Sequence, residues 1–358
     1  MLSSSFAIVA SLFALSHAAP TDKYGILEKR DACPQDSGNI GTFSQPCSTY
    51  TSAVTCPNGI QGKAGGIVLL VHGTGSTGAE SWSEGPYVLE LPSAGPGYDV
   101  CYVDLPSRSL TDAQATSEWV AYNIKDLAPK SATGKVAVIG HSQGNPNIQW
   151  ALDFWPAYRP LVSAFVALAA DFHGTLQGPL ACAVQDLTSG GCNPSVIQQT
   201  TGSHYLDALN VKGNVALVPT TSIYTQYDDV ISPESPRSIA TSRLTGASVH
   251  ALQDLDVCGP AYVADHFTII VSSAAYFLAL DALENGGNAD PSRIDRSACF
   301  WTITDVVVLN DFNRTAALVR GAVNDVVAIS TGPKTKTEPL LKSYVCSSGS
   351  ATSYCETA

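Results

Sequence analysis

The sequence predicts an α/β fold in which helices cover both faces of a mostly parallel sheet. Short apolar runs alternate along the chain with amphipathic stretches, as in repeated strand–helix–strand units. The chain is 45% hydrophobic and only 14% charged, which suits strands that are buried on both faces. No repeat or low-complexity linker divides residues 31–358, so we expect a single domain there.

Five apolar runs are predicted strands, and each ends in a polar or glycine-rich turn. They are residues 66–71, 100–103, 135–140, 164–168 and 215–218. Ser117–Leu127 and Asn147–Phe154 are amphipathic and are predicted helices. Phe267–Leu283 is strongly apolar but too short and too rich in small residues for a membrane span, so we expect a core helix. Catalytic groups of such sheets gather at the carboxyl ends of the strands.

The first thirty residues have the features of processing segments. An apolar run at residues 6–15 has the length of a signal peptide, and the small residues of Ser16–Ala19 suit its cleavage. The run is too short to span a bilayer. Lys29-Arg30 is a dibasic processing site. We predict a signal peptide at 1–18, a propeptide at 19–30 and a secreted mature chain at 31–358.

Charge and cysteine content indicate which partners the protein does not bind and in which kind of compartment it folds. With a net charge of −12, the chain lacks the excess of positive charge that binding to nucleic acid or an anionic membrane requires. All ten cysteines lie in the predicted mature chain, and an even count behind a signal peptide indicates disulfides. No His/Cys spacing suggests a metal site. Asn313 begins the N-glycosylation sequon.

The most informative motif is Gly140-His141-Ser142-Gln143-Gly144, which fits Gly-x-Ser-x-Gly. It follows the predicted strand 135–140 and precedes a predicted helix with Pro146 near its first turn. Glycines there allow a sharp turn that exposes the serine hydroxyl at the edge of the sheet. We therefore predict an α/β-hydrolase fold with Ser142 as nucleophile.

A serine nucleophile needs a histidine base, which in this fold follows both the serine and the acid. Only His250 and His266 come late enough in the chain. His266 lies between a loop and an apolar helix, whereas His250 lies in the strand-like run Ser248–Leu252. We prefer His266.

The acid is less determined by the residues alone. Asp228 and Asp229 both follow the apolar stretch that ends at Tyr224. Asp171 follows the preceding strand and lies at the same edge. All three carboxylates remain candidates at this point.

Backbone N–H groups after the first core strand and after the nucleophile usually stabilise the oxyanion of the tetrahedral intermediate. Here these belong to the segment His72–Gly75 and to Gln143. The hydroxyl of Thr74 is either a further donor or a turn-forming group.

Taken together, the motifs resemble those of the Candida antarctica lipase B-like family of fungal lipases. The resemblance covers most of residues 40–300. It depends on the segments Phe43–Pro46, Val71–Gly78, Ser142–Gly144, Ala170–Thr175, Gln198–Ser203, Val218–Thr221 and Cys258–His266.

The resemblance implies specific roles for site residues. Ser142 becomes the nucleophile, His266 the base and Asp228 the acid, because Tyr224–Pro233 matches the family's acid loop without gaps. Thr74 and Gln143 become the oxyanion residues. Asp171 and Gln199 match polar residues that line the acyl side of the pocket.

The resemblance also implies two of the disulfide pairs. Cys56–Cys101 and Cys258–Cys299 match the family's disulfides by position. For the other six, short-loop closure suggests Cys33–Cys47, Cys182–Cys192 and Cys346–Cys355. The last pair departs from the family, and the sixty C-terminal residues match it poorly.

One departure lies beside the nucleophile, where the family's best-known member has Trp and this chain has His141. Because an imidazole is smaller than an indole, we expect His141 to give a roomier alcohol-side pocket that discriminates less between enantiomers. The segment Leu176–Pro194 is expected to be a lid or a disulfide-pinned rim at the mouth of the site.

We therefore expect a secreted triacylglycerol lipase or related carboxylester hydrolase that forms an acyl-enzyme. It needs no cofactor or metal, and we expect a monomer that acts on lipid or other ester substrates, including at an oil–water interface. An esterase, a polyester hydrolase or an acyltransferase would use the same residues. A binding protein on an inactive hydrolase scaffold is the alternative from another class.

Overall fold

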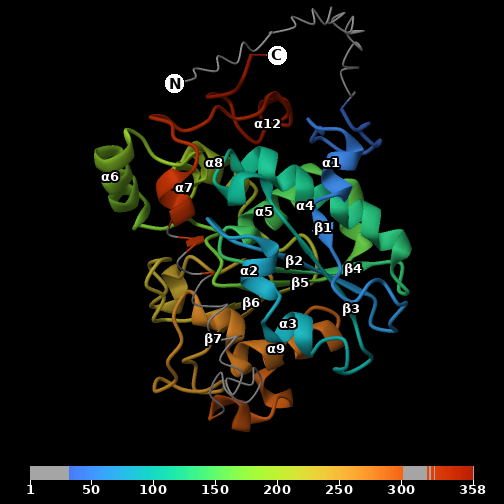
Figure 1. The fold of residues 1–358 in the computed structure, drawn as a ribbon. Coiled ribbons are helices and arrows are strands. Elements are labelled where there is room, and N and C mark those ends of the chain that lie inside the picture. The colour runs from blue at the N-terminus through green and yellow to red at the C-terminus, as the bar shows by residue number, and fades with distance from the viewer. Residues whose placement is uncertain (1–31, 301–320, 322–323, 326, 358) are drawn as a thin grey trace, which may run out of the picture. The chain divides into compact units, whose positions relative to one another are not determined.

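A seven-stranded sheet runs through the part of the chain that the computed structural model describes, residues 32–300, 321, 324–325 and 327–357 (Figure 1). The strand order is β1-β3-β2-β4-β5-β6-β7, and only β1 is antiparallel to its neighbour. The strands are β1 Val54–Thr55, β2 Ile67–Val71, β3 Asp99–Val103, β4 Val136–His141, β5 Val162–Leu168, β6 Thr220–Tyr224 and β7 Ser248–Ala251. The predicted α/β class is confirmed. The predicted signal peptide, propeptide and Asn313 sequon lie outside the described residues.

Four of the five predicted strands are present within two residues of their expected ends, and the fifth begins later than expected. It is β6, Thr220–Tyr224, which ends where the stretch before Asp228 was expected to end, whereas the apolar run 215–218 lies just before it. Hydropathy misses β6 because its buried polar side chains are satisfied by carbonyl groups. Thr221 Oγ1 donates to Gly287 O at 2.8 Å, and Ser222 Oγ donates to Ser242 O at 2.6 Å.

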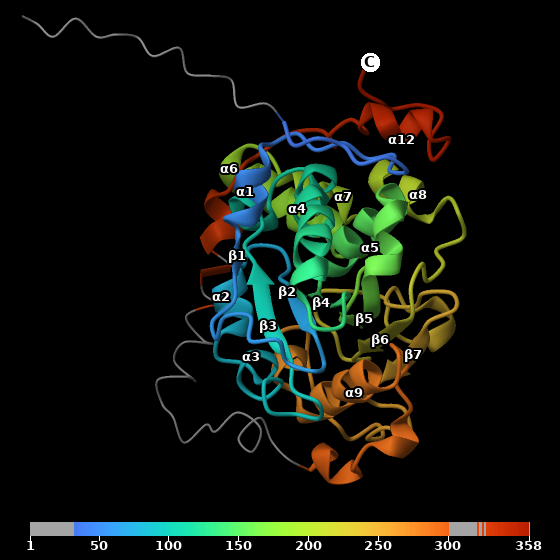
Figure 2. The same cartoon turned by 90° about the vertical axis from the view of Figure 1, so that its right-hand side faces the viewer.

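Alternating residues of β2 divide between two hydrophobic cores, one on each face of the sheet. Ile67, Leu69 and Val71 face the core built with α4 (Ala113–Leu127) and α5 (Gly144–Phe154). Val68 and Leu70 face the core built with α9 (Ser273–Glu284), α2 (Gly78–Trp82) and α3 (Pro86–Leu89). Figure 2 shows the two helical layers on opposite sides of the strands. Burying each Leu, Ile or Val side chain stabilises the folded state by about 1.5–3 kcal/mol, so packing against both faces stabilises the sheet.

The predicted core helix at 267–283 is present in two pieces. Thr268–Val271 forms a 3₁₀ turn, and Ser272 then caps α9, its hydroxyl accepting from Ala275 N at 3.2 Å. In the part of the chain that the structure describes, we find no helix with the length and apolar content that crossing a membrane requires.

The other helices are α1 (Cys47–Thr51), α6 (Gly178–Ser189), α7 (Pro194–Gln198), α8 (His204–Asn210) and α12 (Ser343–Ser347). Buried residues of α1, α8 and α12 belong to the core on the side of α4 and α5. Five disulfides join all ten cysteines, in the pairs Cys33–Cys47, Cys56–Cys101, Cys182–Cys192, Cys258–Cys299 and Cys346–Cys355. These are the pairs expected from the resemblance and from short-loop closure.

Candidate active site

Ser142 lies on a strained turn between β4 and α5, with φ of +52°. The two flanking glycines are required by space. A Cβ on Gly140 would lie 2.3 Å from Asn145 Oδ1, and one on Gly144 would lie 2.5 Å from the Val71 carbonyl oxygen. The Gly-x-Ser-x-Gly pattern is therefore explained by steric exclusion, and the turn presents the serine hydroxyl at the carboxyl edge of the sheet.

The structure brings together the serine, histidine and aspartate that the sequence selected. Ser142 Oγ lies 3.0 Å from His266 Nε2, and His266 Nδ1 lies 2.9 Å from Asp228 Oδ2. The second oxygen of Asp228 accepts backbone N–H bonds from Val230 at 2.9 Å and Ile231 at 2.6 Å. These two donors orient the carboxylate so that one oxygen stays available to the imidazole.

The rival candidates occupy other places. Asp229 Oδ1 accepts only a long bond, 3.4 Å, from the backbone N–H of His266. His250 is on β7, with Nε2 2.8 Å from Ser248 Oγ. Asp171 is fully buried, and neither of its carboxylate oxygens has a hydrogen-bond partner among the described residues.

Burial and charge set the protonation of these groups. Burial disfavours the charged imidazole of His266, but the charge of Asp228 and the hydrogen bond to it outweigh burial, so the pKa of His266 is raised above its ordinary value. Burial raises the pKa of Asp171 to about 7. Below that pH Asp171 is a neutral acid, and Asp228 and Asp229 are the other carboxyl groups whose charge raises the pKa of His266.

Thr74, Gln143 and Gln199 form one hydrogen-bonded cluster beside the nucleophile. Thr74 Oγ1 lies 2.7 Å from Gln143 Oε1, which can only accept, so the hydroxyl donates there. Gln199 Nε2 donates to Thr74 Oγ1 at 3.0 Å. A Cβ on Gly73 would lie 2.7 Å from Ser142 Cβ, so this segment packs directly on the nucleophile.

The imidazole of His141 is bonded to the backbone beside the base. Its Nε2 lies 2.8 Å from the His266 carbonyl oxygen, and since a carbonyl only accepts, Nε2 carries the proton. Burial, together with the neighbouring His266, lowers the pKa of His141 to about 3, so the ring is neutral. The roomier alcohol-side pocket expected from His141 stays a prediction.

A cavity of about 160 Å³ opens over the serine and contains the reacting groups. Its lining is Thr74, Ser142, Thr175, Gln177, Gly178, Ala181, Gln185, Val196, Gln199, Val230, Ile231, His266, Phe267, Asp325 and Ile329. His141 and Asp171 are not among these residues, so their expected places in the substrate pocket stay predictions. Val230 and Ile231 could have been found because they directly follow the pair Asp228-Asp229, whereas Asp325 and Ile329 lie in the poorly matched C-terminal part.

One wall of the cavity is α6, whose polarity is inverted. Its inner side carries Gly178, Ala181 and Gln185. Its outer side carries Leu180 and Leu187, whose exposed fractions are 65% and 89%. Apolar side chains of a water-facing helix normally turn inward, so this outer side is a candidate contact for an apolar surface.

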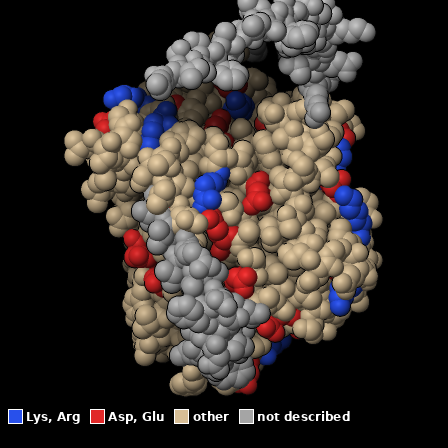
Figure 3. All heavy atoms as spheres, in the orientation of Figure 1, with Lys and Arg blue, Asp and Glu red and all other residues tan. Residues whose placement is uncertain are grey.

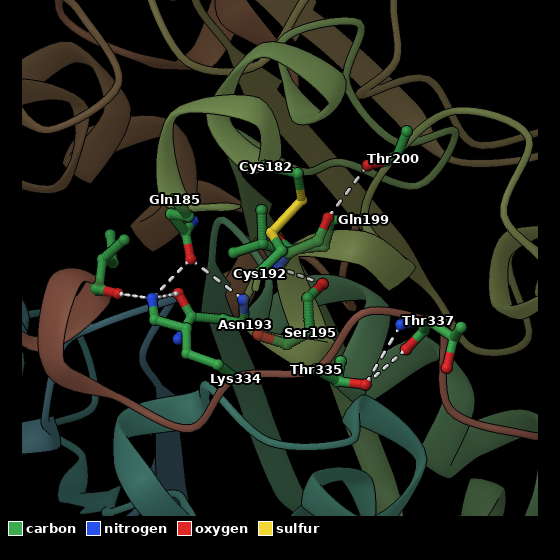
Figure 4. The surroundings of a disulfide bond; sticks show 12 residues. Cys182, Gln185, Cys192, Asn193, Ser195, Gln199, Thr200, Lys334, Thr335 and Thr337 are labelled. Carbon is green, nitrogen blue, oxygen red and sulfur yellow. Dashed lines mark hydrogen bonds between the residues drawn. A yellow bond between two sulfur atoms is a disulfide. The ribbon is translucent and has the colours of Figure 1, made fainter. Parts of the chain in front are cut away.

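Polar and covalent ties hold α6 in place (Figure 4). A disulfide joins Cys182 of the helix to Cys192. Gln185 Oε1 accepts from Lys334 Nζ at 2.8 Å and from the backbone N–H of Asn193 at 3.0 Å. The sequence expectation of a disulfide-pinned segment at the mouth of the site agrees with this arrangement.

Charged side chains are scattered on the face of the molecule shown in Figure 3, where uncharged surface predominates. Within the described ranges, no group of His, Cys, Asp and Glu side chains could hold a metal ion. What the cavity supplies is a hydrogen-bonded serine–histidine–aspartate chain under a mostly apolar wall.

Comparison with known proteins gives one clear result. The chain is 36% identical to lipase B of Pseudozyma antarctica over 323 residues, which cover 86% of this chain and 87% of that protein. The crystal structure of Aspergillus fumigatus lipase B matches with a TM-score of 0.76 and 31% identity, covering 89% of this chain and 76% of that one. No family model matches.

Proposed function

This chain belongs to the lipase B family, and we propose that it hydrolyses triacylglycerols and related lipid esters through an acyl-enzyme on Ser142. Family membership and the α/β-hydrolase fold make it a serine carboxylester hydrolase. The observation that carries the finer proposal is the pair of hydrogen bonds linking Ser142, His266 and Asp228 on the floor of an apolar cavity.

In the first step Ser142 Oγ attacks the ester carbonyl while His266 Nε2 takes its proton. Asp228 stays ionised, holds the Nδ1–H tautomer and stabilises the imidazolium that forms. The tetrahedral intermediate then collapses as His266 protonates the leaving alcohol, which departs and leaves an acyl group on Ser142.

The developing oxyanion needs donors beside Ser142. We assign this role to the backbone N–H groups of Thr74 and Gln143, with the Thr74 hydroxyl as a third donor once it turns from Gln143 Oε1. Gln199 accompanies that rotation, because its amide already donates to Thr74 Oγ1. A water molecule deprotonated by His266 then attacks the acyl-enzyme and releases the fatty acid.

Replacing the nucleophile tests this proposal. Ser142→Ala should lower kcat on p-nitrophenyl butyrate by about 10⁴-fold or more and abolish covalent labelling by a fluorophosphonate probe. Ser195→Ala, another buried serine close to the cavity wall, is the control and should keep both properties. Near-normal hydrolysis by the Ser142→Ala protein would contradict the assignment.

The proposal extends to secretion. Five disulfides are typical of a protein that folds in an oxidising compartment. Mass spectrometry of the extracellular protein should find a mature chain that begins at Asp31 and carries a glycan on Asn313.

The outer side of α6 supports action at a lipid surface, because it places exposed leucines beside the cavity wall. Leu187→Ser should lower the rate on emulsified tributyrin and leave the rate on dissolved p-nitrophenyl butyrate unchanged. Leu255→Ser is the matched control, since Leu255 is 80% exposed but lies outside α6. A rate jump as tributyrin passes its solubility limit is expected of a lipase with a mobile lid, whereas smooth saturation would favour an esterase.

A further inference from the structure

The turn that follows β3 has an uncommon backbone. Ser107, Arg108 and Ser109 have φ of +48°, +58° and +58°, all in the left-handed region. For residues other than glycine each such conformation costs about 1–2 kcal/mol, and strain of this kind persists where surrounding contacts impose it, often at functional sites. The turn therefore points to contacts that require this backbone path.

Those contacts are with the oxyanion segment Gly73–Gly75. Gly75 N donates to the Arg108 carbonyl at 2.8 Å, and Arg108 Nε donates to the Gly75 carbonyl. At the other end, His72 Nδ1 lies 2.8 Å from the Gly73 carbonyl while His72 Nε2 accepts from Leu105 N at 3.0 Å. The segment is thus tied to the turn on both sides of Thr74.

The Arg108 side chain makes further connections. Its guanidinium pairs with Glu80 on α2, and Nη2 lies 3.4 Å from Asp325 Oδ1. Glu80 in turn accepts from Asn324 Nδ2 at 2.8 Å. Asp325 lines the catalytic cavity, and a Cβ on Gly75 would lie 3.0 Å from the Asp325 carbonyl oxygen. One half-buried arginine therefore joins the oxyanion segment to the cavity wall.

We propose that Arg108 is a positioning residue for ester hydrolysis, which holds Gly75 so that the Thr74 N–H and hydroxyl point at the developing oxyanion. This inference depends on the proposed function. Arg108 touches neither Ser142 nor the reacting atoms, and acts by preventing the Gly73–Gly75 segment from moving away from Ser142. A displacement of oxyanion donors weakens the transition state more than the bound substrate, because the charge appears only in the transition state.

The geometry requires an arginine. Its planar fork lets Nε bond the Gly75 carbonyl while Nη2 meets the two carboxylates, whereas the single ammonium group of lysine serves one of these at a time. Arg108→Lys therefore keeps the positive charge near Glu80 and removes the bond from Nε to the Gly75 carbonyl, while the backbone bond from Gly75 N to the carbonyl of residue 108 stays.

Kinetics of Arg108→Lys test the proposal. We expect kcat on p-nitrophenyl butyrate to fall about tenfold with KM within about twofold of the normal value. The inhibition constant of butylboronic acid, whose serine adduct places an oxygen where the oxyanion forms, should rise by the same factor. Glu80→Gln, which removes one anchor of the guanidinium, should show the same pattern at about two- to threefold and serves if Arg108→Lys does not fold.

Arg159→Lys is the matched control. Arg159 Nε donates to the Leu152 carbonyl at 2.7 Å and Nη2 lies 3.4 Å from Asp153 Oδ1, so it loses the same kind of clamp away from the cavity. Its thermal unfolding midpoint should shift as in Arg108→Lys, while kcat and boronate affinity stay normal. Normal boronate affinity in Arg108→Lys, or an equal kinetic loss in Arg159→Lys, would overturn the inference. A wild-type protein that neither hydrolyses the ester nor binds the boronate would instead refute the proposed function.

Discussion

The floor and the wall of the cavity are built in opposite ways. Ser142 is on a turn between a fully buried strand and a fully buried helix, and the strained path is enforced by close packing at Gly140 and Gly144. The wall helix α6 buries only two of its residues and is held by a disulfide and by hydrogen bonds to Gln185. The contrast fits two tasks: the chemistry needs fixed distances, while the wall is the part that we propose meets lipid substrates and an apolar surface.

The largest expected contrast is in catalysis. Asp228→Asn should reduce kcat about 10⁴-fold, because an amide cannot hold the imidazole in the tautomer that accepts the serine proton. Asp229→Asn, on the neighbouring carboxylate, should change kcat less than about tenfold. Steady-state kinetics on p-nitrophenyl butyrate would measure both. Similar losses of kcat in the two variants would contradict the assignment of Asp228 as the acid.

Stability should show the same division. Gly144→Ala places a Cβ 2.5 Å from a backbone oxygen, and we expect a loss of about 2–4 kcal/mol in the free energy of unfolding. Gly190→Ala, at the end of α6, meets no atom within 4 Å and changes only a left-handed φ of +73°, at a cost of about 1 kcal/mol. Urea denaturation would compare them. Equal losses of stability would mean that the turn at Ser142 is no more tightly packed than the end of α6.

The buried carboxyl group of Asp171 should make the stability of the protein depend on pH. Its pKa is raised to about 7 by burial, so the folded state holds a proton that the unfolded chain releases near its ordinary pKa of 3.8. Its contribution to stability is therefore complete below about pH 4 and falls as the pH rises toward 7.

Asp171→Asn removes that dependence and should raise the free energy of unfolding at pH 8 by about 2–4 kcal/mol. At pH 4 it should have little effect. Unfolding curves at the two pH values measure the difference, and Asp186→Asn, on the exposed side of α6, should show no such change. A gain that is equal at both pH values would argue against burial of a charge as the cause.

The smallest expected effect belongs to the wall. Replacing both Cys182 and Cys192 by serine should loosen α6 and speed its cleavage in limited proteolysis, with kcat on p-nitrophenyl butyrate within about twofold of normal. Because the closed loop is short, the global cost should not exceed about 3 kcal/mol. A large fall in kcat would show that the wall helix also positions reacting groups.

Sequence patterns predicted most of the fold because strands buried on both faces leave long apolar runs. The exceptions were the two-residue strand β1 and β6, where Thr221 and Ser222 are buried but bonded to carbonyls of Gly287 and Ser242. A residue pattern does not show such partners, since they come from loops 20 and 66 residues away.

The site divides similarly. Ser142 has a local signature because its steric requirement is met by its own neighbours in sequence. His141 has no such signature, and its bond to the carbonyl of His266 could not be predicted because the two residues are 125 positions apart. Arg108 and Asp325 also gave no signal, because their contact joins segments 217 residues apart.

Around Ser142, the sequence by itself determined the nucleophile, the base and, through its resemblance to fungal lipases, the acid. Only the tertiary structure decided which way His141 turns, which residues wall the cavity and what holds the oxyanion segment. The physical reason is range: a tight turn is set by a few adjacent residues, whereas a hydrogen bond between distant segments exists only once the sheet has brought them together.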